Sequence, residues 1–236
     1  MKIDTAFVLA AGKGTRMAPL TDNLPKPLIS LNDRPLLDYV FDYLRAENVQ
    51  HLVVNAHHFP DKISQYLDGV SGFASVDLVQ EPVLLETGGG LKNAAQFLPK
   101  NAPFFMINGD AFWVDKDGTM GALAALSNTF DAKDMDILLL LTPVLRMTLT
   151  EGVGDYRMAA DGRLTRAQDK TGDLMFTGIR IVHPRILAGM DDGIYSFLQQ
   201  MDRAEAQGRL YGVVYGGDWH HISTPDDVDR VEKSLV

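Results

Sequence analysis

Small and basic residues lie close together near the start of the chain. Gly12 and Gly14 flank Lys13, and Arg16 and Lys26 follow soon after. Glycines let backbone N–H groups approach a ligand closely, and the three cations add positive charge at the same loop. This combination favours phosphate binding. The spacing excludes a Walker A loop, and the dinucleotide-binding fingerprint lacks its third glycine.

Two further polar segments follow apolar runs. Asn108 and Asp110 come directly after an apolar strand, and an aspartate there suits a Mg²⁺ ligand that bridges phosphates. Gln80 and Glu81 end another expected strand, and the glycines that begin with Gly88 then open a helix, whose free N–H groups bind acceptors. An ordinary glycine-rich helix start is the alternative for that segment.

The overall charge sharpens the case for a local cluster of cations. The chain has 236 residues, with 22 Lys and Arg against 31 Asp and Glu, which gives a net charge of −9. Nucleic-acid binding needs a basic footprint, so nucleic acid is excluded as a bulk partner. An acidic protein that binds an anionic nucleotide needs local cations, and Lys13, Arg16 and Lys26 are the predicted cluster.

The lengths of the apolar runs and the absence of cysteine indicate how the protein relates to membranes and which chemistry it lacks. The most apolar runs, Ala6–Ala11 and Ile137–Leu141, are too short to cross a membrane, so no membrane partner is expected. No leader pattern precedes the first strand, and a cytoplasmic protein is expected. With no cysteine, disulfides and thiol chemistry are excluded. No coiled-coil seam or extended apolar stripe is evident, which favours a monomer.

Strands and helices alternate through the first half of the chain. Strands separated by helices of this length predict parallel pairing with right-handed crossovers. Beyond Thr142 the pattern changes, and Asp161-Gly162 predicts a hairpin turn. The predicted fold is α/β, a Rossmann-like doubly wound mixed sheet with a small antiparallel addition, in a single domain over residues 1–236. The expected strands are Ala6–Leu9, Gln50–Asn55, Phe73–Gln80, Pro103–Ile107, Met135–Thr142, Asp155–Ala160, Arg163–Ala167, Leu174–Val182 and Leu210–Tyr215, and the expected helices are Arg34–Asn48, Phe59–Leu67, Gly88–Leu98, Asp117–Asn128, Ser196–Gln207 and Pro225–Leu235.

The segment from Leu9 to Thr21, with Pro25-Lys26-Pro27, resembles the signature of the sugar-1-phosphate nucleotidyltransferases, L-A-A-G-x-G-x-R-[ML]-x-P-L-T followed by P-K-P. The resemblance implies that a nucleoside triphosphate and a sugar 1-phosphate react to give a nucleotide sugar and pyrophosphate. It implies that Arg16 binds the leaving pyrophosphate, Lys26 the α-phosphate and Asp110 a catalytic Mg²⁺. The nucleotide-binding loop would consist of Leu9, Ala10, Ala11, Gly12, Lys13, Gly14 and Thr15.

The same resemblance suggests how the base and the sugar are bound. It implies that the loop after the third strand contacts the base, with Gln80 or Glu81 and Gly88 as candidates. The candidates for the sugar rest on looser matches, and plain strand and turn residues are the alternative. These sugar candidates are Asn108, Asp169, Lys170, Thr177 and Gly178.

One segment near the end of the chain departs from the family pattern W-x-D-[IV]-G-T-P, whose aspartate is the second metal ligand. Trp219 and Ile222 match, but His221 stands at the aspartate position. Mg²⁺ prefers oxygen ligands, whereas imidazole suits later transition metals, so Mn²⁺ is an alternative cofactor. Three possibilities stay open: His221 is a ligand, Asp110 and the phosphates hold the metal alone, or His221 is packed without a metal role.

Three stretches narrow the resemblance within the family. Val53–His58, Leu85–Gly90 and Phe176–Ile179 are most similar to the short N-acetylmuramate-1-phosphate uridylyltransferase branch, which acts in peptidoglycan recycling. A mannose- or heptose-1-phosphate guanylyltransferase is the nearest alternative. A non-catalytic nucleotide-sugar-binding regulator is an alternative of another class. Arg16, Lys26 and Asp110 together favour the enzyme, because a regulator has no need of all three.

Overall fold

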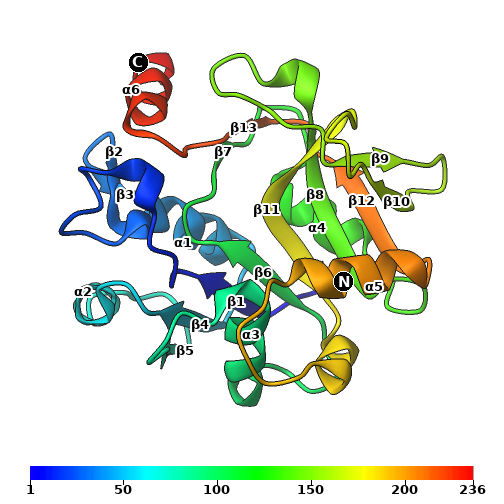
Figure 1. Cartoon of the computed structure of the whole chain (residues 1–236), viewed down its shortest axis with the longest axis horizontal. Helices are drawn as coiled ribbons and strands as arrows, with labels where there is room; N and C mark the ends of the chain where they lie inside the picture. The colour runs from blue at the N-terminus through cyan, green and yellow to red at the C-terminus, as the bar shows by residue number, and fades with distance from the viewer. Residues whose placement is uncertain (236) are drawn as a thin grey trace.

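A nine-stranded mixed sheet forms the centre of the molecule (Figure 1). The computed structural model describes residues 1–235. Strands β5, β4, β1 and β6 are parallel neighbours in that order, and β11 joins them to the remaining strands. The strands are β1 (Thr5–Leu9), β4 (His51–Ala56), β5 (Ser75–Gln80), β6 (Phe104–Asn108), β8 (Ile137–Pro143), β9 (Tyr156–Met158), β10 (Leu164–Arg166), β11 (Leu174–Val182) and β12 (Leu210–Val214).

Both faces of the sheet are covered by helices, because residues of each strand point alternately to two apolar clusters. In β1, Ala6 and Val8 belong to one cluster and Phe7 to the other. This three-layer arrangement confirms the predicted doubly wound α/β fold. The first cluster takes in α1 (Leu36–Ala46), α2 (Pro60–Leu67) and α4 (Ala122–Thr129), and the second takes in α3 (Glu86–Asn93) and α5 (Leu198–Ala206).

The parallel register brings the ends of three strands together. Leu9, the last residue of β1, lies beside Asn55 of β4 on one side and Asn108 of β6 on the other. The segments that follow β1 and β6 therefore leave the sheet at the same edge, which is where open α/β sheets bind ligands.

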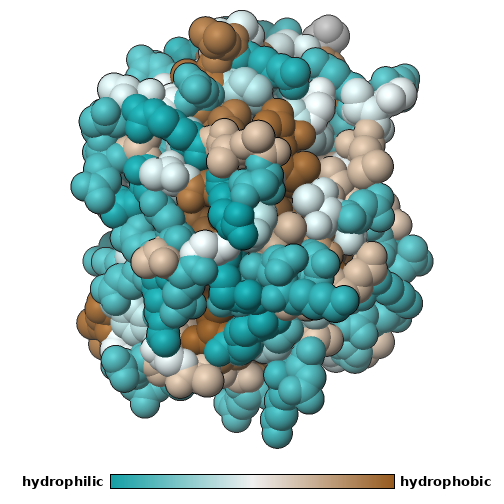
Figure 2. Space-filling model, turned by 90° about the vertical axis from the view of Figure 1, so that its right-hand side faces the viewer, coloured by the Kyte–Doolittle hydropathy of each residue, from teal (hydrophilic) through white to brown (hydrophobic). Residues whose placement is uncertain are grey.

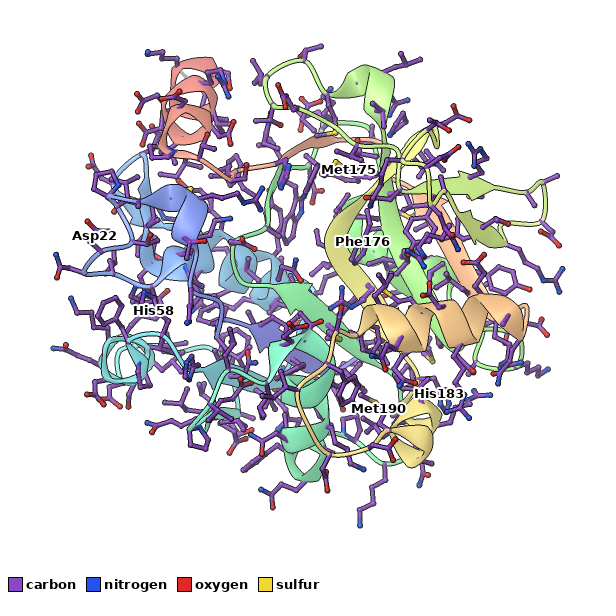
Figure 3. All side chains as sticks on the ribbon, in the orientation of Figure 1. Asp22, His58, Met175, Phe176, His183 and Met190 are labelled. Carbon is purple, nitrogen blue, oxygen red and sulfur yellow. The ribbon has the colours of Figure 1, made fainter. Side chains whose placement is uncertain are left out.

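The second half of the sheet differs from the expectation for Met135–Thr142. That segment forms β8, which pairs antiparallel with β11 and parallel with β12, and not with a parallel strand of the first half. β11 is apolar over most of its length and lies antiparallel between β6 and β8. Phe176 of β11 faces the side of the sheet on which α5 lies (Figure 3). The predicted hairpin around Asp161-Gly162 is confirmed as β9 and β10.

Two short strand pairs escape prediction, because strands of two or three residues show no periodicity. β2 (Ser30–Leu31) pairs with β3 (Arg34–Pro35). The predicted helix start at Arg34-Pro35 is therefore wrong, and α1 begins at Leu36, directly after this pair. β7 (Phe112–Val114) pairs with β13 (Asp218–His220), which holds the late segment of the chain against the residues that follow β6.

The surface on one side of the molecule is predominantly polar. The side of the molecule that carries α5 and β10 is largely hydrophilic, with apolar side chains in small patches between polar ones (Figure 2). Within residues 1–235 no helix combines the length and the apolar character needed to cross a bilayer.

Helix α6 (Pro225–Ser234) begins with a capping box. Thr224 accepts from the backbone N–H of Asp227, and the Asp227 carboxylate accepts from the backbone N–H of Thr224. Burial opposes ionisation of Asp227, but hydrogen bonds from Ser223, Thr224 and Arg230 outweigh it and lower the pKa of Asp227 to about 2. The carboxylate therefore stabilises the fold in its charged form.

We expect Asp227→Ala to lower the free energy of unfolding by about 1–2 kcal/mol at neutral pH, because it removes the carboxylate half of the capping box of α6. Urea unfolding measures the change, with Asp226→Ala, an exposed acid in the same turn, as the control. Because the folded pKa lies below the ordinary value, the difference between Asp227→Ala and the natural chain should shrink as the pH falls from about 4 toward 2. A difference that does not depend on pH would contradict this assignment.

Candidate active site

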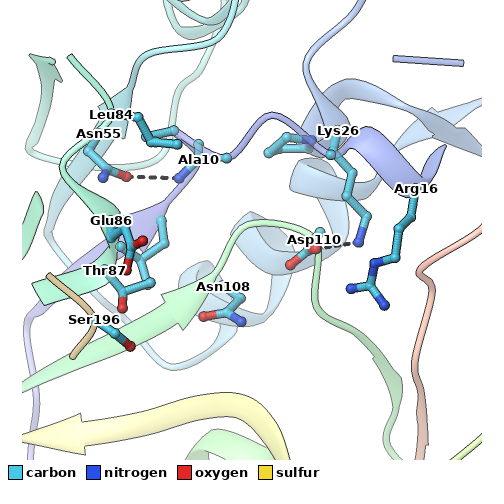
Figure 4. A pocket seen from close by; sticks show the side chains of 15 residues that line it. Ala10, Arg16, Lys26, Asn55, Leu84, Glu86, Thr87, Asn108, Asp110 and Ser196 are labelled. Atoms are coloured by element: carbon cyan, nitrogen blue, oxygen red, sulfur yellow. Dashed lines mark hydrogen bonds and ion pairs between the residues drawn. The ribbon is translucent and has the colours of Figure 1, made fainter. Parts of the chain in front are cut away.

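A cavity of about 430 Å³ opens at the carboxyl edge of β1 and β6 (Figure 4). Its walls come from the loop after β1, from the start of α3 and from the segment after β6. A cavity of this size suits a small-molecule ligand. The predicted residues that line it are Leu9, Ala10, Ala11, Gly12, Gly14, Arg16, Lys26, Asn108 and Asp110, and Pro27, Asn55, Leu84, Glu86, Thr87 and Ser196 join them.

An ion pair joins the loop after β1 to the segment after β6. Lys26 Nζ lies 2.5 Å from Asp110 Oδ2 and donates a second hydrogen bond to the carbonyl oxygen of Ile222 at 2.6 Å. The Lys26 side chain is 12% exposed and the Asp110 side chain 32%. One ammonium group therefore connects three segments that are far apart in the sequence, at the mouth of the cavity.

Arg16 extends toward this ion pair from the short helix η1 (Thr15–Met17) (Figure 4). It is exposed, and no ion pair of the described chain involves it. A guanidinium in this position is available to bind two oxygens of an incoming phosphate group.

A buried polar network fixes the start of the glycine loop, residues 10–16, which follows β1. The backbone N–H of Ala10 donates to Asn55 Oδ1 at 2.8 Å, and Asn55 Nδ2 donates to Glu81 Oε1 at 2.7 Å. The other carboxylate oxygen of Glu81 accepts from the N–H of Leu85 at 3.0 Å. Asn55 is 2% exposed and Glu81 is 4% exposed. Because buried polar groups that lose their partners are costly, this network holds the loop against the segment that leads into α3.

His221 lies near the ion pair. Burial lowers the pKa of His221, and the positive charges of Lys26 and Arg16 lower it further, against the effect of a hydrogen bond with the backbone of Glu151 and of the charge of Asp110. Its ring stacks on Trp219, with ring centroids 5.7 Å apart. The imidazole is therefore neutral at pH 7 and can accept a hydrogen bond or ligate a metal.

A second cavity of about 230 Å³ adjoins the first. Thr87, Asn108 and Ser196 line both. Residues of β11 and α5 line the second cavity, and among them are Arg180 and Phe176 of β11. The two together form a bipartite site: a glycine loop with cations at one end and a side chamber at the other.

Comparison with known proteins agrees with this geometry. The model of the nucleotidyl transferase family matches residues 5–152, and the N-acetylmuramate alpha-1-phosphate uridylyltransferase of Caulobacter vibrioides is 36% identical over 237 residues, covering 98% of this chain and 96% of the relative. The chain belongs to the nucleotidyl transferase family.

Two further similarities extend over nearly the whole of this nucleotidyl transferase. The Neisseria meningitidis protein of the same name as the Caulobacter relative is 29% identical over 222 residues, with 93% of each chain covered. The solved structure of a UDP-glucose pyrophosphorylase complexed with UDP-glucose has a TM-score of 0.79 at 15% identity and covers 99% of this chain and 98% of its own. That likeness shows the fold alone.

Some of the predicted nucleotide residues do not line the main cavity of this nucleotidyl transferase. Lys13 and Gln80 are exposed outside it, and Thr15 lines a small neighbouring hollow beside Arg16. Glu81 belongs to the buried network. The side chains of Lys13 and Gln80 therefore contribute charge or polarity near the cavity without forming its wall.

Gly88 is used within the fold. Its N–H donates to the carbonyl oxygen of Tyr195 at 2.9 Å, and a Cβ at this position would lie 2.6 Å from the Tyr195 ring. At Gly90 a Cβ would lie 2.6 Å from Glu81 Oε1 and 2.8 Å from Asn55 Nδ2. These glycines thus permit close packing of α3 against the buried network and the loop before α5.

The predicted sugar residues separate into two groups. Asn108 lines both cavities, Gly178 packs on the Asn108 side chain with φ +82°, and Lys170 lines the second cavity. Thr177 is buried, and its hydroxyl donates to the carbonyl oxygen of Leu140, while Asp169 is exposed in a turn and accepts from Thr171. The structure brings neither Thr177 nor Asp169 into a cavity.

Several lining residues carry no sequence signal that isolates them. Asn55 is the exception, because a polar residue at the end of an otherwise apolar strand is a sequence signal for a site residue. Glu86 adopts a positive φ of 59°, at the point where the chain turns into α3. Glu86, Leu84 and Ser196 reach the cavity only because the loops before α3 and α5 pack together, as the hydrogen bond from the N–H of Tyr195 to the carbonyl oxygen of Leu85 shows.

The donor set for a divalent cation is small. Across residues 1–235 no three His, Cys, Asp or Glu side chains converge as a metal site would require. Asp110 offers one carboxylate at the mouth of the cavity, with His221 nearby. Mg²⁺ in phosphate-transfer sites is held by one or two carboxylates together with substrate phosphates and waters, so this set fits a cation that arrives with the nucleotide.

We expect Asn55→Ala to lower the free energy of unfolding by about 2–3 kcal/mol, because it leaves the Ala10 N–H and a Glu81 oxygen buried without partners. It should also weaken nucleotide binding, since Ala10 is part of the cavity wall. Urea unfolding and isothermal titration measure the two effects, with the exposed Asn93→Ala on α3 as the control. Equal stability and affinity for Asn55→Ala and Asn93→Ala would contradict the role of the network.

Proposed function

We propose that this protein joins UTP to N-acetylmuramate 1-phosphate, giving UDP-N-acetylmuramate and pyrophosphate. The observation that carries the proposal is the meeting of Lys26, Asp110 and Arg16 at the mouth of one cavity that is built on a glycine loop. The choice of base and sugar is supported by two relatives of that printed activity, which match nearly the whole chain. The proposed product belongs to peptidoglycan recycling in the cytoplasm.

The proposed reaction needs positioning and charge neutralisation. An oxygen of the sugar phosphate attacks the α-phosphorus of UTP, and the bond from that phosphorus to the oxygen bridging to the β-phosphate breaks, so that pyrophosphate leaves with the electron pair. The attacking phosphate is already anionic at neutral pH, so no general base is required. Lys26 neutralises the α-phosphate, and Arg16 neutralises the departing pyrophosphate. Catalysis of phosphate transfer rests mainly on such charge neutralisation and on the positioning of the reacting groups.

Asp110 would hold Mg²⁺, with His221 as a second ligand if the cation is Mn²⁺. When bound, such a cation neutralises phosphate charge and helps orient the reacting groups. Lys26 sets the position of the Asp110 carboxylate through their ion pair. The Lys26 bond to the Ile222 carbonyl keeps the His221 segment beside the same carboxylate.

Pyrophosphate release across a grid of nucleoside triphosphates and sugar 1-phosphates tests the proposed function. We expect turnover with UTP and N-acetylmuramate 1-phosphate to exceed that of every other pair, with Mg²⁺ and Mn²⁺ assayed in parallel. Faster turnover with Mn²⁺ would favour His221 as a ligand. Turnover confined to GTP with mannose or heptose 1-phosphate would keep the mechanism but overturn the proposed substrates.

Asp110→Asn separates an enzyme from a nucleotide-sugar-binding regulator. The amide keeps the size of the side chain but removes the charge that would hold the cation, so we expect kcat to fall by about 100-fold or more. UTP affinity measured in EDTA should change little. Asp218→Asn is the comparison, because Asp218 is a nearby acid that is paired with Lys116 and lies outside the cavity. Full turnover in Asp110→Asn, or a larger loss in Asp218→Asn, would contradict the role of Asp110.

A further inference from the structure

A buried arginine without an acidic partner lies in the wall of the second cavity. Arg180 on β11 is 3% exposed, and its Nε has no hydrogen-bond partner. None of the ion pairs among residues 1–235 involves it. A buried charge without a partner is costly, so an arginine kept in this state calls for an anion that arrives from outside the chain.

The surroundings of Arg180 hold its guanidinium in place without neutralising it. The guanidinium carbon lies 5.2 Å from the centroid of the Phe176 ring and 4.9 Å from that of Phe197. Burial lowers the pKa of Arg180 to about 9, so the group still carries its charge at neutral pH. The two rings leave the edges of the guanidinium as its donors, and donors of this shape match a carboxylate.

The other cations of the second cavity are already paired. Arg166 lies 2.7 Å from a carboxylate oxygen of Asp202, and Lys170 lies 2.8 Å from one of Asp155. Within the part of the chain that the structure describes, Arg180 is therefore the cation of this cavity whose charge is not matched by a protein carboxylate.

The position of Arg180 relative to the main cavity indicates which part of a ligand would reach it. Arg180 lies beside Met106 in the sheet, and Asn108, which lines both cavities, comes two residues later on β6. Two residues of a strand span about 7 Å, roughly the length of one sugar ring. With the phosphates at Lys26, a group that reaches Arg180 belongs to the sugar and not to the nucleotide.

We propose that Arg180 binds a carboxylate on the acceptor sugar and thereby selects an acidic sugar 1-phosphate over a neutral one. This rests on the proposed function, in which the sugar is N-acetylmuramate, an acid. A neutral sugar of the same ring would leave the guanidinium desolvated and uncompensated, so it is rejected by the absence of a partner and not by a clash.

The test compares two product nucleotides that differ only in the lactyl ether, which bears the carboxylate. Isothermal titration gives the Kd of UDP-N-acetylmuramate and of UDP-N-acetylglucosamine for the full chain. We expect the natural chain to bind the acidic compound about 10- to 100-fold more tightly. Arg180→Met should remove this preference by weakening only the acidic compound, since methionine fills the space between the rings without a charge.

Two further variants control for folding and for charge in general. Arg157→Met removes a cation of the same half of the sheet that already has an acidic partner, Asp169, and that lines neither cavity, so it should leave the preference intact. Arg180→Lys keeps a positive charge, and it should retain part of the preference even if Arg180→Met does not fold. Equal weakening of both compounds in Arg180→Met would show a purely structural role and overturn the proposal.

The two Kd values of the natural chain distinguish a failure of the inference about Arg180 from a failure of the proposed function. If it binds both UDP-sugars with the same Kd, the selection by Arg180 is wrong, while binding of a UDP-sugar, which the proposed function requires, is retained. If it binds neither, the proposed function fails, and the inference fails with it.

Discussion

The ion pair between Lys26 and Asp110 is the interaction on which the site depends. Two opposite charges 2.5 Å apart, both only partly exposed, keep the loop after β1 and the segment after β6 together. The carbonyl oxygen of Ile222 accepts from the same ammonium and adds the late segment of the chain. In the proposed reaction, an incoming triphosphate would bring negative charge to this point, where Lys26 and Arg16 would neutralise it and Asp110 would share a cation with it.

The sheet supplies the constraint that makes this interaction possible. Parallel neighbours end at one edge, so Leu9, Asn55 and Asn108 lie side by side in the sheet although they are distant in the sequence. The buried network of Asn55 and Glu81 then holds the start of the glycine loop at Ala10, because each polar group in the network depends on its neighbour for a hydrogen-bond partner. Rigid strands thus position a loop whose own backbone must stay open to phosphate.

The position of β11 in the sheet determines the wall of the second cavity. A simple doubly wound sheet is parallel, but β11 lies antiparallel between β6 and β8, and its residues form part of the wall of the second cavity. Gly178, at positive φ, lets β11 approach the side chain of Asn108. The same strand carries Phe176 and Arg180, so one element both joins the two halves of the sheet and lines the second cavity, which we propose to hold the sugar.

Sequence reasoning succeeded where the signal is local. The spacing of Gly12, Gly14, Arg16 and Lys26 located the glycine loop, and hydrophobic periodicity predicted the main strands and helices. It failed where the outcome depends on packing between distant segments. The order of β8 and β11, and the approach of Glu86 and Ser196 to the cavity, follow from tertiary contacts that no periodicity encodes.

Arg180 and Gly88 illustrate the same limit. Arg180 sits within an apolar strand, and only the structure shows that it is buried without a partner. The glycines after Thr87 resemble a ligand-binding helix start, yet Gly88 donates its N–H to Tyr195 and its missing side chain makes room for that ring. Composition could not distinguish a glycine that faces a ligand from one that faces another loop.

A crystal structure of the chain with UDP-N-acetylmuramate would test the central claim most directly. The account predicts that the α-phosphate lies against Lys26, that the uridine occupies the cavity beside Ala10 and Asn55, and that the sugar passes Asn108 toward Arg180. Nucleotide density away from the glycine loop, or a sugar that points away from the second cavity, would contradict it.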